Sequence, residues 1–289
     1  MIHDPRRGIL LVVLFGFMIL GMDTLAKHLT ALVPITVLMW GRYTFHVAAT
    51  PLLGMPGGMR GLVATSQPWL QVLRSLCMLL STTFFFTAIK FIPLADAIAI
   101  GFVAPFIITG LSIPMLGEKV GVRRWAACAV GFAGALLIIR PGFEDRHWAY
   151  LLPLCAALSG SFYAILTRRL GPQERPTTSL FYTAAVGALV MSCIAPFDWV
   201  WPTPATWAML VALGALAAVS HLVLIHAYRH APASLLAPFG YLEIIWATLF
   251  GYLAFGDFPD ALTWAGIAVI VASGLYVFHR ETIRRKAPT

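Results

Sequence analysis

The chain has 289 residues, 60% of them hydrophobic and only 11% charged, and its mean hydropathy is +0.84. Soluble domains carry about 25% charged residues, so this composition excludes a soluble globular protein, and the missing alternation of polar and apolar residues argues against a membrane β-barrel. The net charge of +8 is scattered over doublets such as Arg6-Arg7 and Arg284-Arg285, which is typical of topology signals and argues against a nucleic-acid partner.

Ten apolar stretches, each of about 20 residues, are long enough to cross roughly 30 Å of hydrocarbon as helices. Gly and Pro residues separate them. The first stretch follows Arg6-Arg7, as a signal peptide would, but it has no obvious small-residue cleavage site, so we expect an uncleaved membrane helix. The predicted helices cover 8–27, 34–53, 71–91, 93–116, 122–140, 149–168, 177–197, 206–228, 232–254 and 262–280.

The cysteines Cys77, Cys128, Cys155 and Cys193 lie inside apolar stretches without the spacing of metal ligands. We therefore predict buried, reduced thiols, no disulfide and no metal. The Gly54–Gly61 segment lacks the Lys-Ser/Thr of a phosphate loop, so we expect no nucleotide site and no cofactor.

The basic residues predict the orientation of the chain in the membrane. Fifteen Lys and Arg residues fall on the side of the N-terminus, and four (Lys27, Lys90, Arg140 and Arg146) fall on the other side. Because short cytoplasmic loops are rich in Lys and Arg, both termini are predicted to be cytoplasmic.

The stretch 88–140 is repeated at 227–279, a shift of 139 positions without a gap. Each copy ends a five-helix half, which predicts repeats at 1–142 and 143–289. Since five is odd, the second half must cross the membrane in the opposite sense, and inverted repeats of transporters place the substrate near the middle of the membrane. The matches include Ala88 with Ala227, Pro93 with Pro232, Gly101 with Gly240, Gly117 with Gly256, Trp125 with Trp264, Lys90 with Arg229 and Glu118 with Asp257.

Two charged residues are predicted in the middle third of the membrane. Counting 1.5 Å per residue places Arg42 roughly 12 Å, and Glu243 roughly 13 Å, below the outer surface. Such charges normally face a cavity or a partner. We expect both to line a substrate path, with Glu243 binding an ammonium group or a proton. The alternatives are a structural ion pair, or a neutral Glu243 bonded to the backbone.

An aromatic layer is predicted at the same depth, which would suit amphipathic or aromatic solutes if it lines a cavity. Ordinary packing is the alternative for any single phenylalanine, whereas Tyr241 and Tyr163 are better candidates because a buried hydroxyl needs a partner. The layer comprises Phe84, Phe85, Phe86, Phe102, Tyr241 and Trp246.

Several further polar residues are candidates. His46 follows Arg42 by one helical turn, and His221 lies in a later helix; either is able to titrate near neutral pH, although buried histidines are more often neutral and bonded. Asp96 is expected to favour a helix N-terminus, with a gating role as the alternative. Asp23 and Lys27, spaced i, i+4, predict a local salt bridge.

Small residues recur at four- or eight-residue spacing in the fifth and tenth helices, which favours close helix packing and a scaffold role. These residues are Ala127, Gly131, Ala135, Gly266 and Gly274.

The motifs of the fourth and ninth helices resemble those of the EamA-type family of the drug/metabolite transporter superfamily. The similarity lies in Pro105, in Leu116-Gly117-Glu118 before a glycine-rich helix, in Tyr241-Leu242-Glu243 and in Phe255-Gly256-Asp257. The chain departs from the pattern at Ile244, where many members have proline, and at Asp257, where many have glutamate. The resemblance implies a bacterial inner-membrane exporter of amino acids or related metabolites.

Two classes of function remain open. The first is a secondary transporter that moves a small organic solute by alternating access, with protons as a possible coupling ion and lipids as its surroundings. The second is an intramembrane enzyme, for which no His-Glu-x-x-His or Gly-x-Ser-x-Gly motif is present, so we expect no enzyme. A flippase for a lipid-linked carrier is close to the first. Substrate, direction and oligomeric state do not follow from the sequence.

Overall fold

The computed structural model describes residues 4–53, 58–117, 121–140, 147–170, 174–231 and 233–286, which form helices and no strand. Four short elements are η1 (Thr50–Leu53), α3 (Gly58–Val63), η2 (Trp148–Leu151) and η3 (Ala195–Asp198). The remaining helices are α1 (Pro5–Leu29), α2 (Ile35–Ala49), α4 (Pro68–Phe91), α5 (Leu94–Gly101), α6 (Ala104–Leu116), α7 (Val122–Ile139), α8 (Leu152–Leu170), α9 (Pro176–Ile194), α10 (Pro204–His230), α11 (Ala233–Gly240), α12 (Glu243–Phe255) and α13 (Ala261–Lys286).

The all-helical prediction is confirmed, but two of the predicted helices are broken. The stretch 93–116 divides into α5 and α6, and the stretch 232–254 divides into α11 and α12. Pro105, in the first turn of α6, has no N–H to continue the ladder from α5. At both breaks the chain tightens into i→i−3 hydrogen bonds, from Val103 N to Ile100 O (3.1 Å) and from Leu242 N to Phe239 O (3.1 Å).

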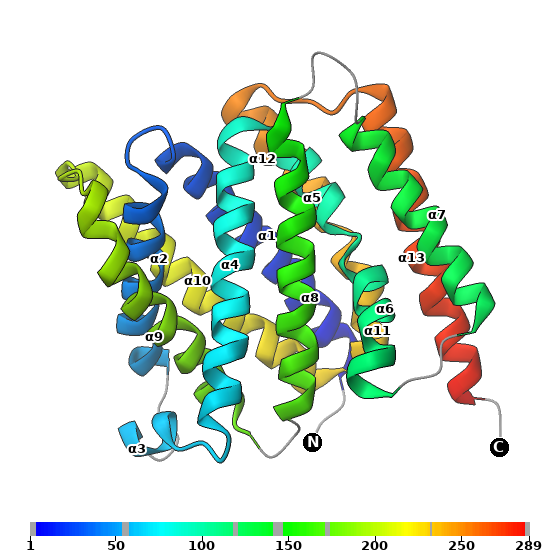
Figure 1. The fold of residues 1–289 in the computed structure, drawn as a ribbon, viewed down its shortest axis with the longest axis horizontal. Coiled ribbons are helices and arrows are strands. Elements are labelled where there is room, and N and C mark those ends of the chain that lie inside the picture. Colours follow the sequence, from blue (N-terminus) through cyan, green and yellow to red (C-terminus); the bar gives the residue numbers. More distant parts are fainter. Residues whose placement is uncertain are drawn as a thin grey trace.

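The inverted repeat is confirmed by the bounds of these elements. Adding 139 to the bounds of α5 and α6 gives those of α11 and α12. Both copies then end in a left-handed glycine cap, Gly117 with φ 69° and Gly256 with φ 73°. Figure 1 shows α4 and its counterpart α10 running in opposite directions, and both ends of the chain at the same end of the bundle. The predicted repeat boundary at 142/143 and Glu118 lie outside the described residues.

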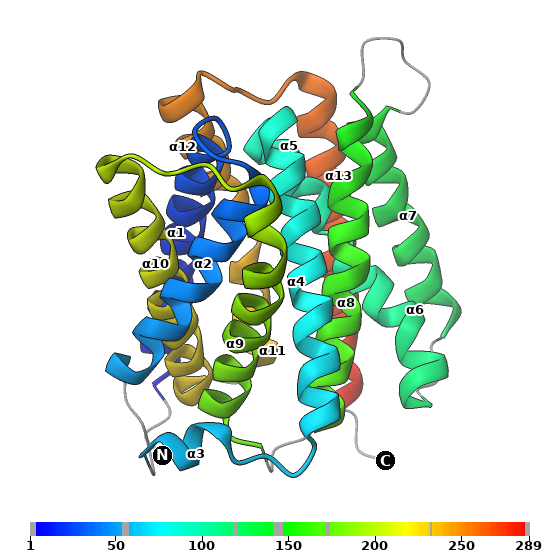
Figure 2. The ribbon, with the colours of Figure 1, turned by 60° about the vertical axis from the view of Figure 1, so that its left-hand side comes forward.

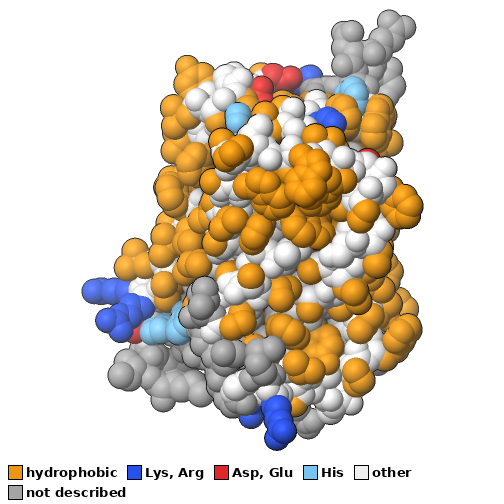
Figure 3. Space-filling view, turned by 90° about the vertical axis from the view of Figure 1, so that its left-hand side faces the viewer, with side chains coloured by type: hydrophobic (Ala, Val, Ile, Leu, Met, Phe, Trp, Pro, Cys, Tyr) orange, Lys and Arg blue, Asp and Glu red, His pale blue; other side chains and the backbone are white. Residues whose placement is uncertain are grey.

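Within the described residues, eight helical stretches are long and apolar enough to cross a membrane, and Trp125–Ile139 of α7 is a shorter apolar helix. Helix α2, with 15 residues, is not among them, so the count of ten spans stays a prediction. The face in Figure 3 is apolar over its middle, and its charged side chains gather toward the two ends. That distribution fits a bundle surrounded by lipid tails.

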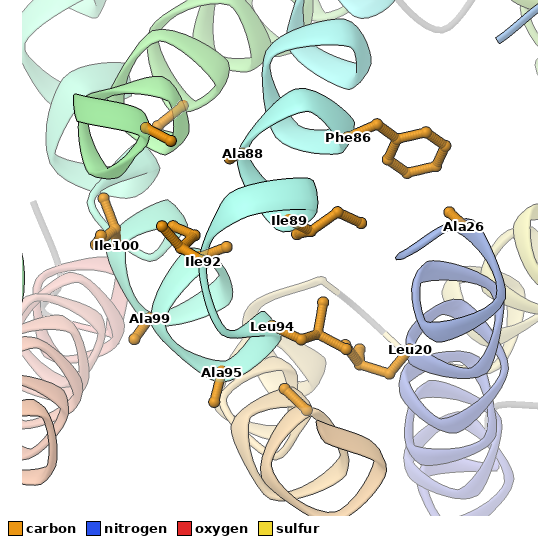
Figure 4. Packing of buried hydrophobic residues seen from close by; sticks show 14 of the residues in the cluster. Leu20, Ala26, Phe86, Ala88, Ile89, Ile92, Leu94, Ala95, Ala99 and Ile100 are labelled. Atoms are coloured by element: carbon orange, nitrogen blue, oxygen red, sulfur yellow. The ribbon is translucent and has the colours of Figure 1, made fainter. Parts of the chain in front are cut away.

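Helices from both repeats share one core. In Figure 4, Phe86 and Ile89 of α4 and Leu94 of α5 point toward Leu20 and Ala26 of α1. Helices α1, α4 and α5 contact one another, and α4 and α5 lie close together in both Figure 1 and Figure 2. The same core includes Leu210 of α10, Ala247 of α12 and Ile270 of α13, so both repeats contribute to it.

Helices α7 and α13 pack side by side along their length (Figure 1). A Cβ on Gly266 would lie 2.7 Å from the carbonyl oxygen of Gly134, so this close approach requires glycine. Ser273 Oγ donates to Ala127 O (2.5 Å) across the same pair. The small residues of the two helices have separate roles, however, because Gly131 contacts Phe106 of α6 and Gly274 contacts Tyr241.

The four cysteines are free thiols, but the prediction that all are buried is wrong. Cys128 is buried and Cys77 partly buried, whereas Cys155 and Cys193 are exposed. An apolar stretch of a membrane protein does not need burial inside the protein, because the surrounding lipid is itself apolar.

Candidate functional site

A cavity of about 380 Å³ lies between the two repeats, within the size range of small-molecule sites. We call it the first cavity. It is enclosed by α1, α2, α4, α8 and α10 and by the break between α5 and α6. Its polar lining includes Asp23, Arg42, Ser81, Thr82 and His221, and its aromatic lining is Phe15, Phe85 and Phe86.

Arg42 is the cation of the first cavity. It is only 4% exposed, its Nε has no hydrogen-bond partner among the described residues, and its guanidinium lies over the rings of Tyr43 (4.9 Å) and Phe86 (5.5 Å). The rings supply part of the lost solvation through cation–π attraction. The unpaired N–H remains available to a group that enters the cavity.

Two histidines lie beside Arg42. His46 is 3% exposed, and neither of its ring nitrogens has a partner among the described residues. Its ring lies 5.9 Å from that of His221, whose Nδ1 is 2.8 Å from the carbonyl oxygen of Ala217. The structure thus brings together three predicted residues, Arg42, His46 and His221.

Asp23 also lines the first cavity, and its predicted salt bridge with Lys27 is wrong. Lys27 Nζ instead donates to Asp257 Oδ2 (2.6 Å) and to the carbonyl oxygen of Ile92 (3.1 Å). Helix packing offers Lys27 these partners from α4 and from the end of α12, which the i, i+4 rule cannot anticipate. The sequence pattern assigned Asp23 to a local pair, whereas the structure places it in the lining of the first cavity.

A second cavity, of about 470 Å³, lies between α6, α8, α11, α12 and α13. It is lined by Phe102, Thr109, Arg168, Tyr241 and Glu243, among others. The rings of Phe102 and Tyr241 meet edge to face, with centroids 5.2 Å apart. The side chain of Glu243, the first residue of α12, has no hydrogen bond or ion pair with another described residue, and a Cβ on Gly16 of α1 would lie 3.3 Å from its Cγ. Arg42 and Glu243, both predicted in the middle of the membrane, therefore line different cavities.

Tyr163 lies away from both cavities, in a polar cluster around the buried Arg74. Arg74 Nη2 donates to Tyr163 Oη (2.7 Å), its Nε donates to Thr167 Oγ1 (2.9 Å), and its Nη1 donates to the carbonyl oxygen of Ser179 (2.9 Å). The cluster ties α4 of the first repeat to α8 and α9 of the second. Nothing in the sequence pattern singled out Arg74.

Asp96 and Trp246 have different surroundings. Asp96, in the first turn of α5, accepts a hydrogen bond from Tyr150 Oη (2.7 Å) and is buried. Trp246 packs edge to face on Phe17 (5.4 Å), and its Nε1 is buried without a partner among the described residues. Neither residue lines the first or the second cavity.

Ion pairs join the helices at the end of the bundle opposite the termini. Besides Lys27 and Asp257, Arg140 at the end of α7 donates to Asp260 before α13. That hydrogen bond lowers the pKa of Asp260 from 3.8 to about 2. Within the described residues, no group of three or more His, Cys, Asp or Glu side chains is arranged to hold a metal ion.

Comparison with known proteins gives a consistent result. Residues 6–140 and 147–278 each match the EamA-like transporter family. A riboflavin transporter of Vibrio cholerae is 28% identical over 97% of this chain and 95% of its own length. A riboflavin transporter of Rhizobium johnstonii is 33% identical over 78% of this chain and 74% of its own length.

Two further relatives carry other names. An S-adenosylmethionine uptake transporter of Rickettsia bellii is 27% identical over 90% of this chain and 89% of its own length. The pseudopaline exporter CntI of Pseudomonas aeruginosa is 29% identical over 93% of this chain and 94% of its own length. A solved crystal structure matches with a TM-score of 0.63 at 23% identity and covers 93% of this chain and 98% of that one, which supports the fold alone.

Proposed function

We propose that this protein, which belongs to the EamA-like transporter family, is a secondary transporter that binds a small organic metabolite in the first cavity. It is a multi-pass integral protein of the bacterial inner membrane, and its relatives are named as transporters of metabolites rather than as enzymes. The observation that carries the proposal is the first cavity itself, since it lies between inverted repeats and holds the buried Arg42, whose Nε has no partner among the described residues.

The lining of the first cavity favours a substrate with a flat or apolar body and polar groups at its edge. Phe15, Phe85 and Phe86 offer ring faces, while Arg42 and Asp23 offer opposite charges. Riboflavin and S-adenosylmethionine, which name three of the relatives above, both combine an aromatic ring with polar groups. We therefore propose ring-bearing metabolites as the substrate class, and keep amino acids, expected from the family resemblance, as a second class to test.

Alternating access would require contacts at the two ends of the bundle to open in turn. At the end away from the termini, Lys27 ties α1 to α4 and to Asp257. At the end of the termini, the Arg74 cluster ties α4 to α8 and α9. We propose these two sets of contacts as the gates. The direction of net flux depends on gradients, so outward transport stays a prediction.

Transport by purified protein in liposomes tests the proposal. Counterflow is measured with riboflavin, S-adenosylmethionine and a set of amino acids, each present on both sides. We expect uptake of a ring-bearing solute, and a loss of about ten-fold or more for Arg42→Gln, because a group that binds the guanidinium loses its partner. Arg7→Gln is the matched control, since the Arg7 side chain is 72% exposed.

No uptake of any solute would contradict a transporter of these classes, and an Arg42→Gln rate equal to that of wild type would contradict binding in the first cavity. Preferential uptake of amino acids would favour the second class. The sequence left two alternatives, an intramembrane enzyme and a flippase. None of the relatives described above is named as either, and neither is proposed.

A further inference from the structure

The break between α5 and α6 forms a wall shared by the two cavities. Gly101 and Ala104 line the first cavity, whereas Phe102 and Pro105 line the second. Residues that follow one another at the break thus face opposite sides. A displacement of this short segment would join the two cavities into one path.

The wall lies where the two repeats meet. Phe102 of the first break and Tyr241 of the second are equivalent under the shift of 139 residues, and their rings contact each other at 5.2 Å. Equivalent residues of an inverted repeat contact each other only near the axis that relates the repeats. A path between the repeats therefore passes this pair.

The second cavity extends from this pair toward the end of the bundle that holds the termini. Glu243 and Tyr241 lie at the break between α11 and α12, whereas Arg168 is exposed near the last residues of α8. In Figure 1, α6 and α11 lie in the half of the bundle nearer the termini. Residues of the first cavity, such as Pro153 at the start of α8, lie toward the other end.

Glu243 gives the second cavity its chemistry. A carboxyl group at this depth, without a partner among the described residues, is costly unless a proton or a cationic or N–H group meets it. The rings of Phe102, Phe106 and Tyr241 add faces that attract cations and flat groups. A second-repeat residue supplies this carboxyl, because Ala104 occupies the equivalent position in the first repeat.

We propose that the second cavity is a second binding site for the transported metabolite, reached from the side of the termini. In this site Glu243 accepts a hydrogen bond from an N–H or ammonium group of the metabolite, and the Phe102–Tyr241 pair separates the site from the first cavity. The inference rests on the proposed function, since it concerns the same path.

The first test needs no substrate. Val277 lines the second cavity, and Val277→Cys is introduced into a chain whose native cysteines are replaced. Sealed membrane vesicles of known orientation that contain this variant are then treated with an impermeant maleimide. We expect labelling from the side of the termini alone. Phe102→Ala combined with Tyr241→Ala should add labelling from the other side, because the wall is removed.

The chain offers a matched control. Tyr252 and Phe258 form another edge-to-face pair, with centroids 6.1 Å apart, and both are exposed on the surface. Removing both of these rings should leave the labelling of Val277→Cys unchanged. No labelling from the side of the termini, or the same pattern with and without Phe102 and Tyr241, would overturn the inference.

The second test compares the KM for the transported solute from each side of the membrane in oriented vesicles. Glu243→Gln should raise the KM about five-fold or more from the side of the termini, and leave the KM from the other side within about two-fold, because a charge-assisted hydrogen bond is lost in one site only. An equal change on both sides, or none, would overturn the role of Glu243. Wild-type protein that transports nothing would instead contradict the proposed function, and the labelling test would still decide whether the second cavity opens.

Discussion

The charged side chains of the first cavity are defined both by their contacts and by the polar partners that they do not have among the described residues. Arg42 is covered by two rings, and its Nε keeps no hydrogen-bond partner among the described residues. Asp23 faces the same cavity, while its predicted partner Lys27 binds Asp257. Buried groups left in this state cost stability, and active and binding sites are where proteins accept that cost.

Asp23→Asn should reduce transport about ten-fold or more, since it removes the negative charge of the first cavity and leaves Arg42 without an opposite charge there. Counterflow in liposomes measures the effect. Thr24→Val is the neighbouring control, because within the described part of the chain the Thr24 hydroxyl bonds only the carbonyl oxygen of Leu20 in its own helix. A variant Asp23→Asn that keeps more than half of the wild-type rate would contradict a role in binding.

Gly274→Ala should destabilise the protein. The added Cβ would collide with the hydroxyl of Tyr241, and overpacking of this kind costs about 1–3 kcal/mol. Thermal unfolding in detergent measures the effect. Gly21→Ala, in α1, meets no atom within 4 Å and serves as the control, for which no loss of stability is expected. Equal melting temperatures for the two variants would show that Tyr241 moves aside freely.

The sequence predicts a depth for the charged residues, which stays a prediction, but not the face of the helix on which each lies. Counting residues predicts Arg42 and Glu243 in the middle third of the membrane, and the structure puts them in separate cavities. Tyr163 was chosen for its buried hydroxyl, which is satisfied by Arg74 instead. In a helix that is apolar all round, composition does not mark the side that faces a cavity.

At the scale of helices, proline and glycine residues allowed the helix ends to be predicted from the sequence. They predicted the breaks within helices only in part. The left-handed caps at Gly117 and Gly256 end α6 and α12 where the sequence pattern ends. The break before Pro105 has a local cause, whereas Ile244 stands at the equivalent position of the second break. The helix before the second break instead contains Pro238 and ends at Gly240.

Helices α7 and α13 are joined by a contact that should depend on pH. Because Arg140 lowers the pKa of Asp260 from 3.8 in the unfolded chain to about 2, the contact stabilises the folded state above the unfolded value, and this contribution is lost as the pH falls through the folded value. The difference in melting temperature between wild type and Asp260→Asn should therefore be constant near neutral pH and shrink between those two values.

Arg140→Gln tests the cause of this pH dependence. In that background the effect of Asp260→Asn should be smaller and less dependent on pH, because the Arg140 hydrogen bond is gone while the Thr263 N–H contact to residue 260 remains. If the difference in melting temperature between Asp260→Asn and wild type stays constant down to the lowest pH, the lowered pKa of Asp260 would be contradicted.

At the scale of the whole molecule, the repeat was readable from the sequence because the second copy aligns without a gap, and the matching bounds of the broken helices confirm it. The orientation stays a prediction. A fluorescent protein fused after Lys286 should be fluorescent, and alkaline phosphatase fused after Trp201 should be active, because the first reporter folds in the cytoplasm and the second outside it. The reverse pattern would invert the proposed sides of the two cavities.

The central claim is that one cavity between inverted repeats is exposed to each side of the membrane in turn and holds the substrate. Ser81→Cys, in a chain without its native cysteines, places a reporter in the first cavity. The account predicts that an impermeant maleimide labels Ser81→Cys from either side of sealed vesicles, and that a transported solute slows labelling from both sides. Labelling from one side only, or labelling unaffected by every transported solute, would contradict it.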